Sequence, residues 1–169
     1  DTCEGEPSWF NSMYFDEIYH ARTGYENYRA MLGDLTYSTY ETSHPPLGKV
    51  LIAFSISIFG MTPFGWRFAG ALAGALMLPG MYMLGKVLTK RRLAAFAAMF
   101  LMAVDCMHFT QTRIATIDSF VVLFIIWSMV FMLYYARMDY WRVPLWKTLV
   151  PLALSGLFMG LACASKWTG

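Results

Sequence analysis

The sequence predicts an all-α protein, a polytopic bundle of transmembrane helices with an outer loop that contains short amphipathic helices. Hydrophobic residues make up 57% of its 169 residues, charged residues make up 14%, and the mean hydropathy is +0.45. A typical soluble domain carries roughly 25% charged residues. This composition argues against a soluble globular domain, a disordered chain and a basic nucleic-acid binder, so no nucleic-acid partner is expected.

The charges divide the chain into two parts. Residues 1–46 contain eight acidic and two basic side chains, a balance of −6, whereas residues 47–169 have a balance of +8. The first part is polar and rich in aromatic residues, and the second is apolar with short basic segments. We therefore expect an extracytoplasmic loop over 1–46 and membrane helices over 47–169, with the boundary at Pro45-Pro46.

The polar part predicts one helix over residues 12–32. Ser12 can cap it, and side chains recur at helical spacing before Gly33-Asp34 ends it: Phe15, Ile18, Tyr19, Arg22 and Tyr25. Residues 34–46 are rich in Thr, Ser and Tyr and are expected to form a loop. The apolar run 47–60 is short for a span, so it forms either a short span or a helix on the membrane surface.

Four longer apolar runs follow, and each is a candidate span because a membrane helix needs about 20 residues. Small residues in the first run allow close packing, and Pro79 is a candidate kink in it. A basic turn at 89–92 and a polar loop at 137–147 separate the runs. The predicted spans are 64–88, 93–109, 117–136 and 148–165.

The two basic segments predict the orientation in the membrane. Two spans separate them, so they share a side, and their Lys and Arg content assigns that side to the cytoplasm. Residues 1–46 and the connection over 108–118 then face outward. Five ionisable side chains gather near this outer face, where burial in lipid is costly. They suggest a shared polar site and are Arg67, Asp105, Arg113, Asp118 and Lys166.

Asp16 and Glu17 are the candidate catalytic pair. Adjacent residues on a helix point about 100° apart, so one carboxylate can face a cleft while the other braces it. A carboxylate aimed at a hydroxyl group can act as a general base. The alternative is a solvated acidic helix start that is favoured by the helix dipole.

Two further motifs supply candidate binding groups. In His44-Pro45-Pro46-Leu47-Gly48-Lys49, the prolines fix the entry into a helix, and His44 and Lys49 offer donors where the loop meets the membrane; the alternative is a rigid turn with a snorkelling lysine. Arg113 either pairs with Asp118 or binds a lipid phosphate.

No metal site is expected from these motifs. A group of His20, His44, Asp16 and Glu17 has no ligand spacing that demands a metal ion.

In this order, the motifs resemble the protein O-mannosyltransferase family of the C-type glycosyltransferase superfamily. The resemblance covers the chain from about residue 14 to its end. The His-Pro-Pro-Leu-Gly-Lys run is its most specific part. The matching segments are Phe15-Asp16-Glu17, 44–49, Trp66-Arg67-Phe68, Gln111-Thr112-Arg113 with Ile117-Asp118, and Lys166-Trp167-Thr168-Gly169.

The resemblance implies a multi-pass membrane enzyme that transfers mannose, with inversion, from a polyprenyl- or dolichyl-phosphate carrier to Ser or Thr hydroxyls of an acceptor protein. Membrane lipids are the other expected partners, and the membrane is either a bacterial plasma membrane or the endoplasmic reticulum. No cofactor is implied, because the lipid-linked sugar is a substrate, and a role for a divalent cation stays open.

By position, the resemblance makes Asp16 the catalytic acid residue, Glu17 its neighbour and Arg67 an arginine tied to donor handling. His44, Lys49, Arg113, Asp118 and Lys166 fall in family motifs and are candidate substrate-binding residues. The helix expected before Asp16 and the later spans are missing from the sequence, so we expect a fragment of a longer protein that is inactive by itself.

Two alternatives remain at this point. Another lipid-donor glycosyltransferase of the same superfamily, such as an arabinose or aminoarabinose transferase, would use a lipid or glycan acceptor. A transporter or non-catalytic membrane scaffold would explain the spans and the basic loops equally well. It would not explain an acidic pair on the outer loop followed by cations suited to phosphate on the same face.

Overall fold

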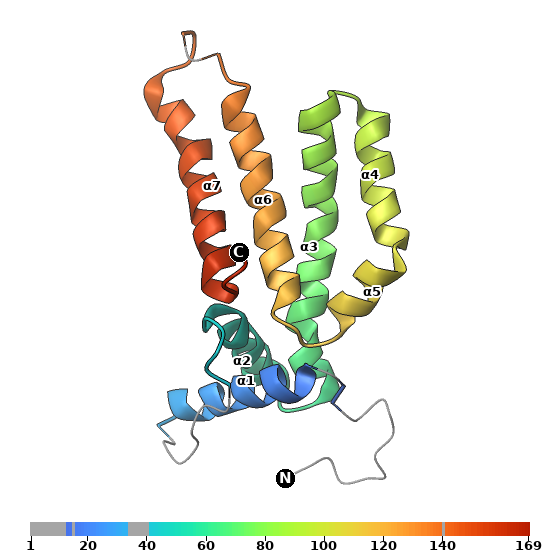
Figure 1. The fold of residues 1–169 in the computed structure, drawn as a ribbon, viewed down its shortest axis with the longest axis vertical. Coiled ribbons are helices and arrows are strands. Elements are labelled where there is room, and N and C mark those ends of the chain that lie inside the picture. The colour runs from blue at the N-terminus through green and yellow to red at the C-terminus, as the bar shows by residue number, and fades with distance from the viewer. Residues whose placement is uncertain (1–12, 15, 34–40, 140) are drawn as a thin grey trace.

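The computed structural model describes residues 13–14, 16–33, 41–139 and 141–169. Within these residues every regular element is a helix, as predicted. Four helices run side by side: α3 (Pro63–Thr89), α4 (Arg92–Val104), α6 (Asp118–Ala136) and α7 (Leu145–Ser165). Two further helices, α1 (Glu17–Met31) and α2 (Leu47–Phe59), lie at one end of this bundle, where α1 crosses beneath the long helices (Figure 1).

Three helices of the described chain are long and apolar enough to cross a membrane, namely α3, α6 and α7. A fourth span is available if α4 and α5 (Cys106–Arg113) together form one bent span. The ends of α3 and α6 lie within one residue of the predicted 64–88 and 117–136. The protein is therefore an integral membrane protein, and α2 is a shorter apolar helix of 13 residues.

The predicted span over 93–109 is not one straight helix in the structure. The chain bends by 58° between α4 and α5. Asp105 has extended backbone angles at this point, and its carboxylate accepts a hydrogen bond of 2.8 Å from the backbone N–H of His108. A helix N-cap of this kind starts a new helix in a new direction. Hydropathy alone does not reveal the break, because the flanking residues are apolar.

Helix α1 starts later than predicted, at Glu17, and Ser12 and Phe15 lie outside the described residues. Its buried face is polar and includes Glu17 and His20, whereas Ile18 and Tyr19 are 48% and 45% exposed. Polar side chains can be buried where partners satisfy them. The exposed Ile18 and Tyr19 suit a helix at a membrane boundary.

Close contacts at glycines hold the elements near this end together. A methyl group on Gly74 of α3 would lie 2.6 Å from the Cβ of Thr112 in α5, and one on Gly48 of α2 would lie 2.7 Å from a side-chain carbon of Ile117. These glycines let α5 and the segment after it approach α3 and α2. They thereby fix the position of residues 112–118, which carry part of the candidate site.

The two basic segments lie at the opposite end of the long helices from α1 (Figure 1). The guanidinium of Arg137 donates a hydrogen bond of 3.0 Å to the carbonyl of Leu88, which joins the end of α6 to the end of α3. The structure thus confirms that both basic segments share one end of the bundle. Their assignment to the cytoplasm stays a prediction.

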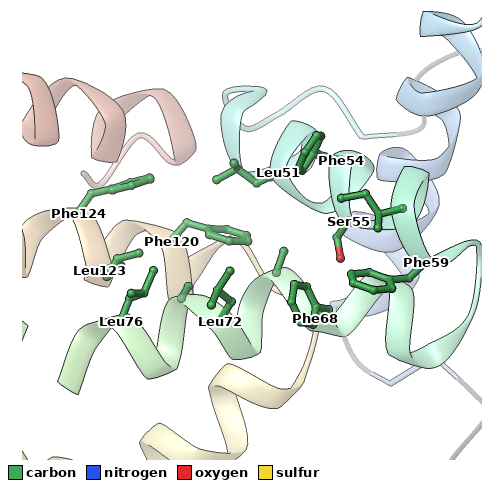
Figure 2. Close-up of a pocket in the computed structure, with 13 residues that line it drawn as sticks. Leu51, Phe54, Ser55, Phe59, Phe68, Leu72, Leu76, Phe120, Leu123 and Phe124 are labelled. Atoms are coloured by element: carbon green, nitrogen blue, oxygen red, sulfur yellow. The ribbon is translucent and has the colours of Figure 1, made fainter. Parts of the chain in front are cut away.

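An apolar cavity of about 310 Å³ lies between α2, α3 and α6. Phe68, Leu72 and Leu76 line it from α3, and Phe120 lines it from α6 (Figure 2). At about 100° per residue, Arg67 lies about 140° from Leu72 and about 180° from Leu76 around α3. The cavity is therefore on another side of α3 from Arg67.

Candidate functional site

Glu17 and Arg67 form the central ion pair of the candidate site. The Nε and Nη2 atoms of Arg67 donate to the two carboxylate oxygens of Glu17 at 2.7 Å and 2.8 Å. The side chain of Glu17 is fully buried, and that of Arg67 is 25% exposed. A paired guanidinium and carboxylate of this geometry fix both position and orientation. The pair therefore ties the start of α1 to the first turns of α3.

Two backbone groups complete the surroundings of Glu17. Its carboxylate accepts hydrogen bonds from the N–H of Tyr14 at 3.0 Å and from the N–H of Ala115 at 2.9 Å. Burial raises the pKa of Glu17, but the hydrogen bonds from Arg67, Tyr14 and Ala115 outweigh it, so the pKa lies below its ordinary value. Glu17 is thus held as a carboxylate whose oxygens are already occupied.

Asp16 differs from its neighbour in this respect. Its side chain is partly exposed, and within the described residues no hydrogen bond or ion pair reaches its carboxylate. Its backbone carbonyl accepts the first helical hydrogen bonds of α1, from the N–H groups of Tyr19 and His20. Of the two acids, Asp16 is therefore the one whose carboxylate is available to a ligand.

The His44–Lys49 motif folds around the carboxylate of Glu41. Lys49 is only 2% exposed, forms an ion pair with Glu41, and donates to the carbonyls of Glu41 and His44 at 2.8 Å and 3.1 Å. Burial opposes ionisation of Glu41, but the hydrogen bonds from Lys49 and Ser43 and the charge of Lys49 lower its pKa to about 2. The ammonium of Lys49 thus organises the turn, and its predicted contact with substrate stays a prediction.

Asp118 and Lys166 form a third ion pair, at 2.6 Å, which joins the start of α6 to the end of α7. Arg113 does not pair with Asp118, which was one of the two predicted possibilities. Its guanidinium instead lies 4.9 Å from the centre of the Phe109 ring, and the residue is exposed. A cation over an aromatic face remains charged and accessible.

The structure places the predicted residues at one end of the bundle in three clusters. Glu17 joins Arg67, Lys49 joins His44 through Glu41, and Asp118 joins Lys166, while Asp16 and Arg113 lie outside these contacts. The indole N–H of Trp167 donates to the carbonyl of Ser43 at 2.7 Å, so the end of α7 touches the His44 motif. Within the described part of the chain, no three His, Cys, Asp or Glu side chains gather into a metal-binding group.

Two members of this site are not among the residues predicted from the sequence. Glu41 lies in the segment predicted to form a loop, and its carboxylate is the centre of the His44–Lys49 cluster. The backbone N–H of Ala115 binds Glu17 from 98 residues away, and no local pattern announces that contact. An acid eight residues before a buried lysine was a signal for the first, because a buried ammonium needs a partner.

The described chain is a helical membrane protein with the buried Glu17–Arg67 pair and the exposed Arg113 at one end of its helices. These features define a membrane protein with a polar site at the membrane boundary. The chain belongs to the dolichyl-phosphate-mannose-protein mannosyltransferase family, whose family model matches residues 57–169. The matched region contains Arg67, Arg113, Asp118 and Lys166. Asp16 precedes it.

Relatives support the same family. The chain is 30% identical over 142 residues to the polyprenol-phosphate-mannose–protein mannosyltransferase of Mycolicibacterium smegmatis and 31% identical over 143 residues to that of Mycobacterium tuberculosis; each match covers 75% of the chain and 27% of the relative. It is 23% identical over 180 residues to dolichyl-phosphate-mannose–protein mannosyltransferase 4 of Saccharomyces cerevisiae, covering 95% of the chain and 23% of that protein. The chain thus spans about a quarter of these relatives. No solved structure matches it.

Proposed function

We propose that the protein containing this chain transfers mannose from a polyprenyl- or dolichyl-phosphate carrier to Ser or Thr hydroxyls of proteins, with inversion at the anomeric carbon. Membership of the mannosyltransferase family supports the reaction class. The observation that carries the residue assignment is the difference between the two acids, because Glu17 is fully occupied by Arg67 and two backbone donors while Asp16 has an accessible carboxylate.

In this proposal Asp16 is the general base. A Ser or Thr hydroxyl is a weak nucleophile until a base takes its proton, and a carboxylate within hydrogen-bond reach can do so while the bond to the anomeric carbon forms. Glu17 positions Asp16, since it anchors the first residue of α1 to Arg67. The pair holds Asp16 at the end of the bundle, where a lipid-linked sugar and a protein can meet.

The leaving group is a lipid phosphate, whose growing negative charge is stabilised by nearby cations. Arg113 is suited to this role because it is exposed and lies over an aromatic ring, outside any ion pair in the described chain. We assign Lys166 and Asp118 a supporting role beside Arg113. We assign Lys49 and His44 the role of shaping the part of the site that receives the acceptor protein. The scheme uses side chains and the two substrates, and no cofactor.

We further propose a multi-pass arrangement in which the α1 end faces the extracytoplasmic or lumenal side. The basic segments at the other end of the bundle support this orientation, because Lys and Arg are enriched in cytoplasmic loops. The acidic loop then meets its acceptor outside the cytoplasm. The membrane of residence is either a bacterial plasma membrane or the endoplasmic reticulum.

The test is sugar transfer by the full-length protein in membranes, supplied with radiolabelled polyprenyl-phosphate mannose and a Ser/Thr-rich peptide. We expect labelled peptide with the wild type and a loss of about 10²–10⁴-fold with Asp16→Asn, the range for removal of a general base. The matched control is Asp139→Asn, since the Asp139 side chain is exposed and, within the described chain, contacts only its sequence neighbours Trp141 and Arg142; it should transfer normally.

Three results would contradict parts of this proposal. Normal turnover by Asp16→Asn would remove Asp16 as the base. Label on a lipid or glycan instead of the peptide would keep the donor and change the acceptor. No transfer of mannose by the wild type to any acceptor would refute the proposed reaction.

A further inference from the structure

His20 lies one helical turn after Asp16 on the same face of α1. Its backbone N–H donates to the carbonyl of Asp16 at 3.0 Å, which is the regular i to i+4 contact of a helix. Side chains four residues apart on a helix are neighbours. Asp16 is the residue just before α1, and its charge acts on the imidazole of His20.

The imidazole of His20 is buried and incompletely bonded. The residue is 6% exposed, and in the described chain its buried Nδ1 atom has no hydrogen-bond partner. A buried polar nitrogen without a partner costs about 1–3 kcal/mol. Within the described residues, the Nδ1 of His44 and the Oε2 of Glu41 are likewise buried without a hydrogen-bond partner, so these unsatisfied polar atoms gather around His20.

Charged and titratable groups face His20 from each element packed against it. Asp16 lies on its own helix, and the Glu41 carboxylate is 3.9 Å from Nδ1. The His44 ring centre is 6.5 Å from the ring centre of His20, and Lys49 reaches the same carboxylate from α2. The negative charges of Glu41 and Asp16 favour an imidazolium at His20, and the charge of Lys49 opposes it.

Burial lowers the pKa of His20, and the charges of Glu41 and Asp16 offset this only in part. The folded-state pKa lies below the ordinary value of 6.5, so the imidazole is neutral at pH 7 and one of its nitrogens can accept a proton. It becomes charged, and loses this capacity, as the pH falls through that lowered pKa.

We propose that His20 is a positioning residue that receives the proton which Asp16 removes from the acceptor hydroxyl. This inference rests on the proposed mannosyl transfer. The acceptor oxygen forms its bond to the anomeric carbon as its proton moves to Asp16. The bond from that carbon to the phosphate oxygen breaks, and the electron pair leaves with the lipid phosphate. The proton then passes from Asp16 to His20 and on to water, which restores the Asp16 carboxylate.

The test compares kcat and KM of the full-length protein between pH 5 and pH 8 for the wild type and His20→Asn. Asparagine places an amide where the imidazole Nδ1 lies but does not titrate. We expect kcat at pH 7 to fall by about 10- to 100-fold, at the low end of acid–base effects, while KM changes less than about twofold. The matched control is His108→Asn on α5, which should leave both constants unchanged.

The pH profile separates a proton acceptor from a structural residue. With His20 required in its neutral form, the wild-type kcat should fall as the pH drops through the lowered pKa of His20, and this fall should be absent from the profile of His20→Asn. A variant that lowers kcat but keeps the wild-type pH profile would overturn the inference, as would an unchanged kcat.

Two further results are decisive. If His20→Asn does not fold, His20→Gln is measured in the same way, and failure of both variants to fold would assign His20 a structural role and overturn the inference. Absence of transfer by the wild type would refute the proposed function. Normal transfer by the wild type, together with wild-type kcat and pH profile in the His20 variants, would refute the proton transfer to His20 alone.

Discussion

The ion pair between Glu17 and Arg67 should be the strongest single contact that attaches α1 to the bundle. Its two hydrogen bonds, at 2.7 Å and 2.8 Å, join a fully buried carboxylate to a guanidinium whose side chain is 25% exposed. The perturbation is a double-mutant cycle of Glu17→Ala, Arg67→Ala and the double variant. The cycle isolates the coupling between the two side chains.

The structure sets the expected size of each effect. Removing one partner of a buried ion pair costs about 3–5 kcal/mol, and the partial exposure of Arg67 places this pair near the lower value. Glu17→Ala also removes the acceptor for the N–H groups of Tyr14 and Ala115, and a hydrogen bond to a charged group contributes about 1.5–3 kcal/mol. Glu17→Ala should therefore destabilise the protein more than Arg67→Ala.

The two backbone hydrogen bonds are lost in both Glu17→Ala and the double variant, so they cancel in the cycle. We expect a coupling energy of about 2 kcal/mol, from the two charge-assisted hydrogen bonds after partial screening by water. The matched control is the pair of Asp118 and Lys166, which is as short at 2.6 Å but has side chains 47% and 25% exposed. Exposed pairs couple by about 0.2–1 kcal/mol.

The assay is the free energy of unfolding of the full-length protein in mixed micelles, from titration with a denaturing detergent. Hydrogen exchange of the α1 amides in the same variants would show whether α1 detaches first. A coupling for Glu17 and Arg67 equal to or smaller than that of the control pair would refute the reasoning, because burial would then have added nothing to the contact.

Three other changes have definite expected outcomes. Gly74→Ala should destabilise the protein by about 1–3 kcal/mol in the same unfolding assay, because the added methyl would lie 2.6 Å from the Cβ of Thr112, whereas Gly156→Ala meets nothing within 4 Å and should be neutral or stabilising. The folded-state pKa of Glu41, about 2, lies below its ordinary value of 4.5. Its contribution of about 3 kcal/mol to the free energy of unfolding is therefore present above pH 4.5 and is lost as the pH falls towards 2. Glu41→Gln should flatten this part of the curve of stability against pH. Arg113→Lys keeps the positive charge but loses the planar guanidinium that can bind a phosphate with two hydrogen bonds. It should therefore raise the KM for the lipid-phosphate donor severalfold with little change in the free energy of unfolding. An unchanged KM would remove Arg113 from the donor site.

The long helices could be predicted from the sequence because each is a sustained apolar run with polar ends. The predicted 64–88 and 117–136 match α3 and α6 closely for that reason. The break at Asp105 could not be predicted from hydropathy, because one capping carboxylate within an apolar segment redirects the chain. The polar buried face of α1 was also missed, since its partners lie in distant parts of the sequence.

The site shows the same limit. Asp16 and Glu17 could be singled out as a pair, but not assigned separate structural roles, because the partners of Glu17 are a guanidinium 50 residues away and a backbone N–H 98 residues away. The inward direction of Lys49 depends likewise on Glu41, which no motif identified. Residue types indicated the chemistry, and the tertiary contacts decided which groups are occupied.

These contacts imply that the two adjacent acids should fail in different ways when each is changed to its amide. Asp16→Asn alters a partly exposed group without a described partner, so the unfolding free energy should stay within about 0.5 kcal/mol, the range for surface changes, while turnover is lost. Glu17→Gln puts an amide against four donors from Arg67, Tyr14 and Ala115, so it should lower the free energy of unfolding. Turnover should fall as a consequence, because α1 is displaced. If Asp16→Asn were the destabilising change and Glu17→Gln the stable one, the roles of base and anchor would have to be exchanged.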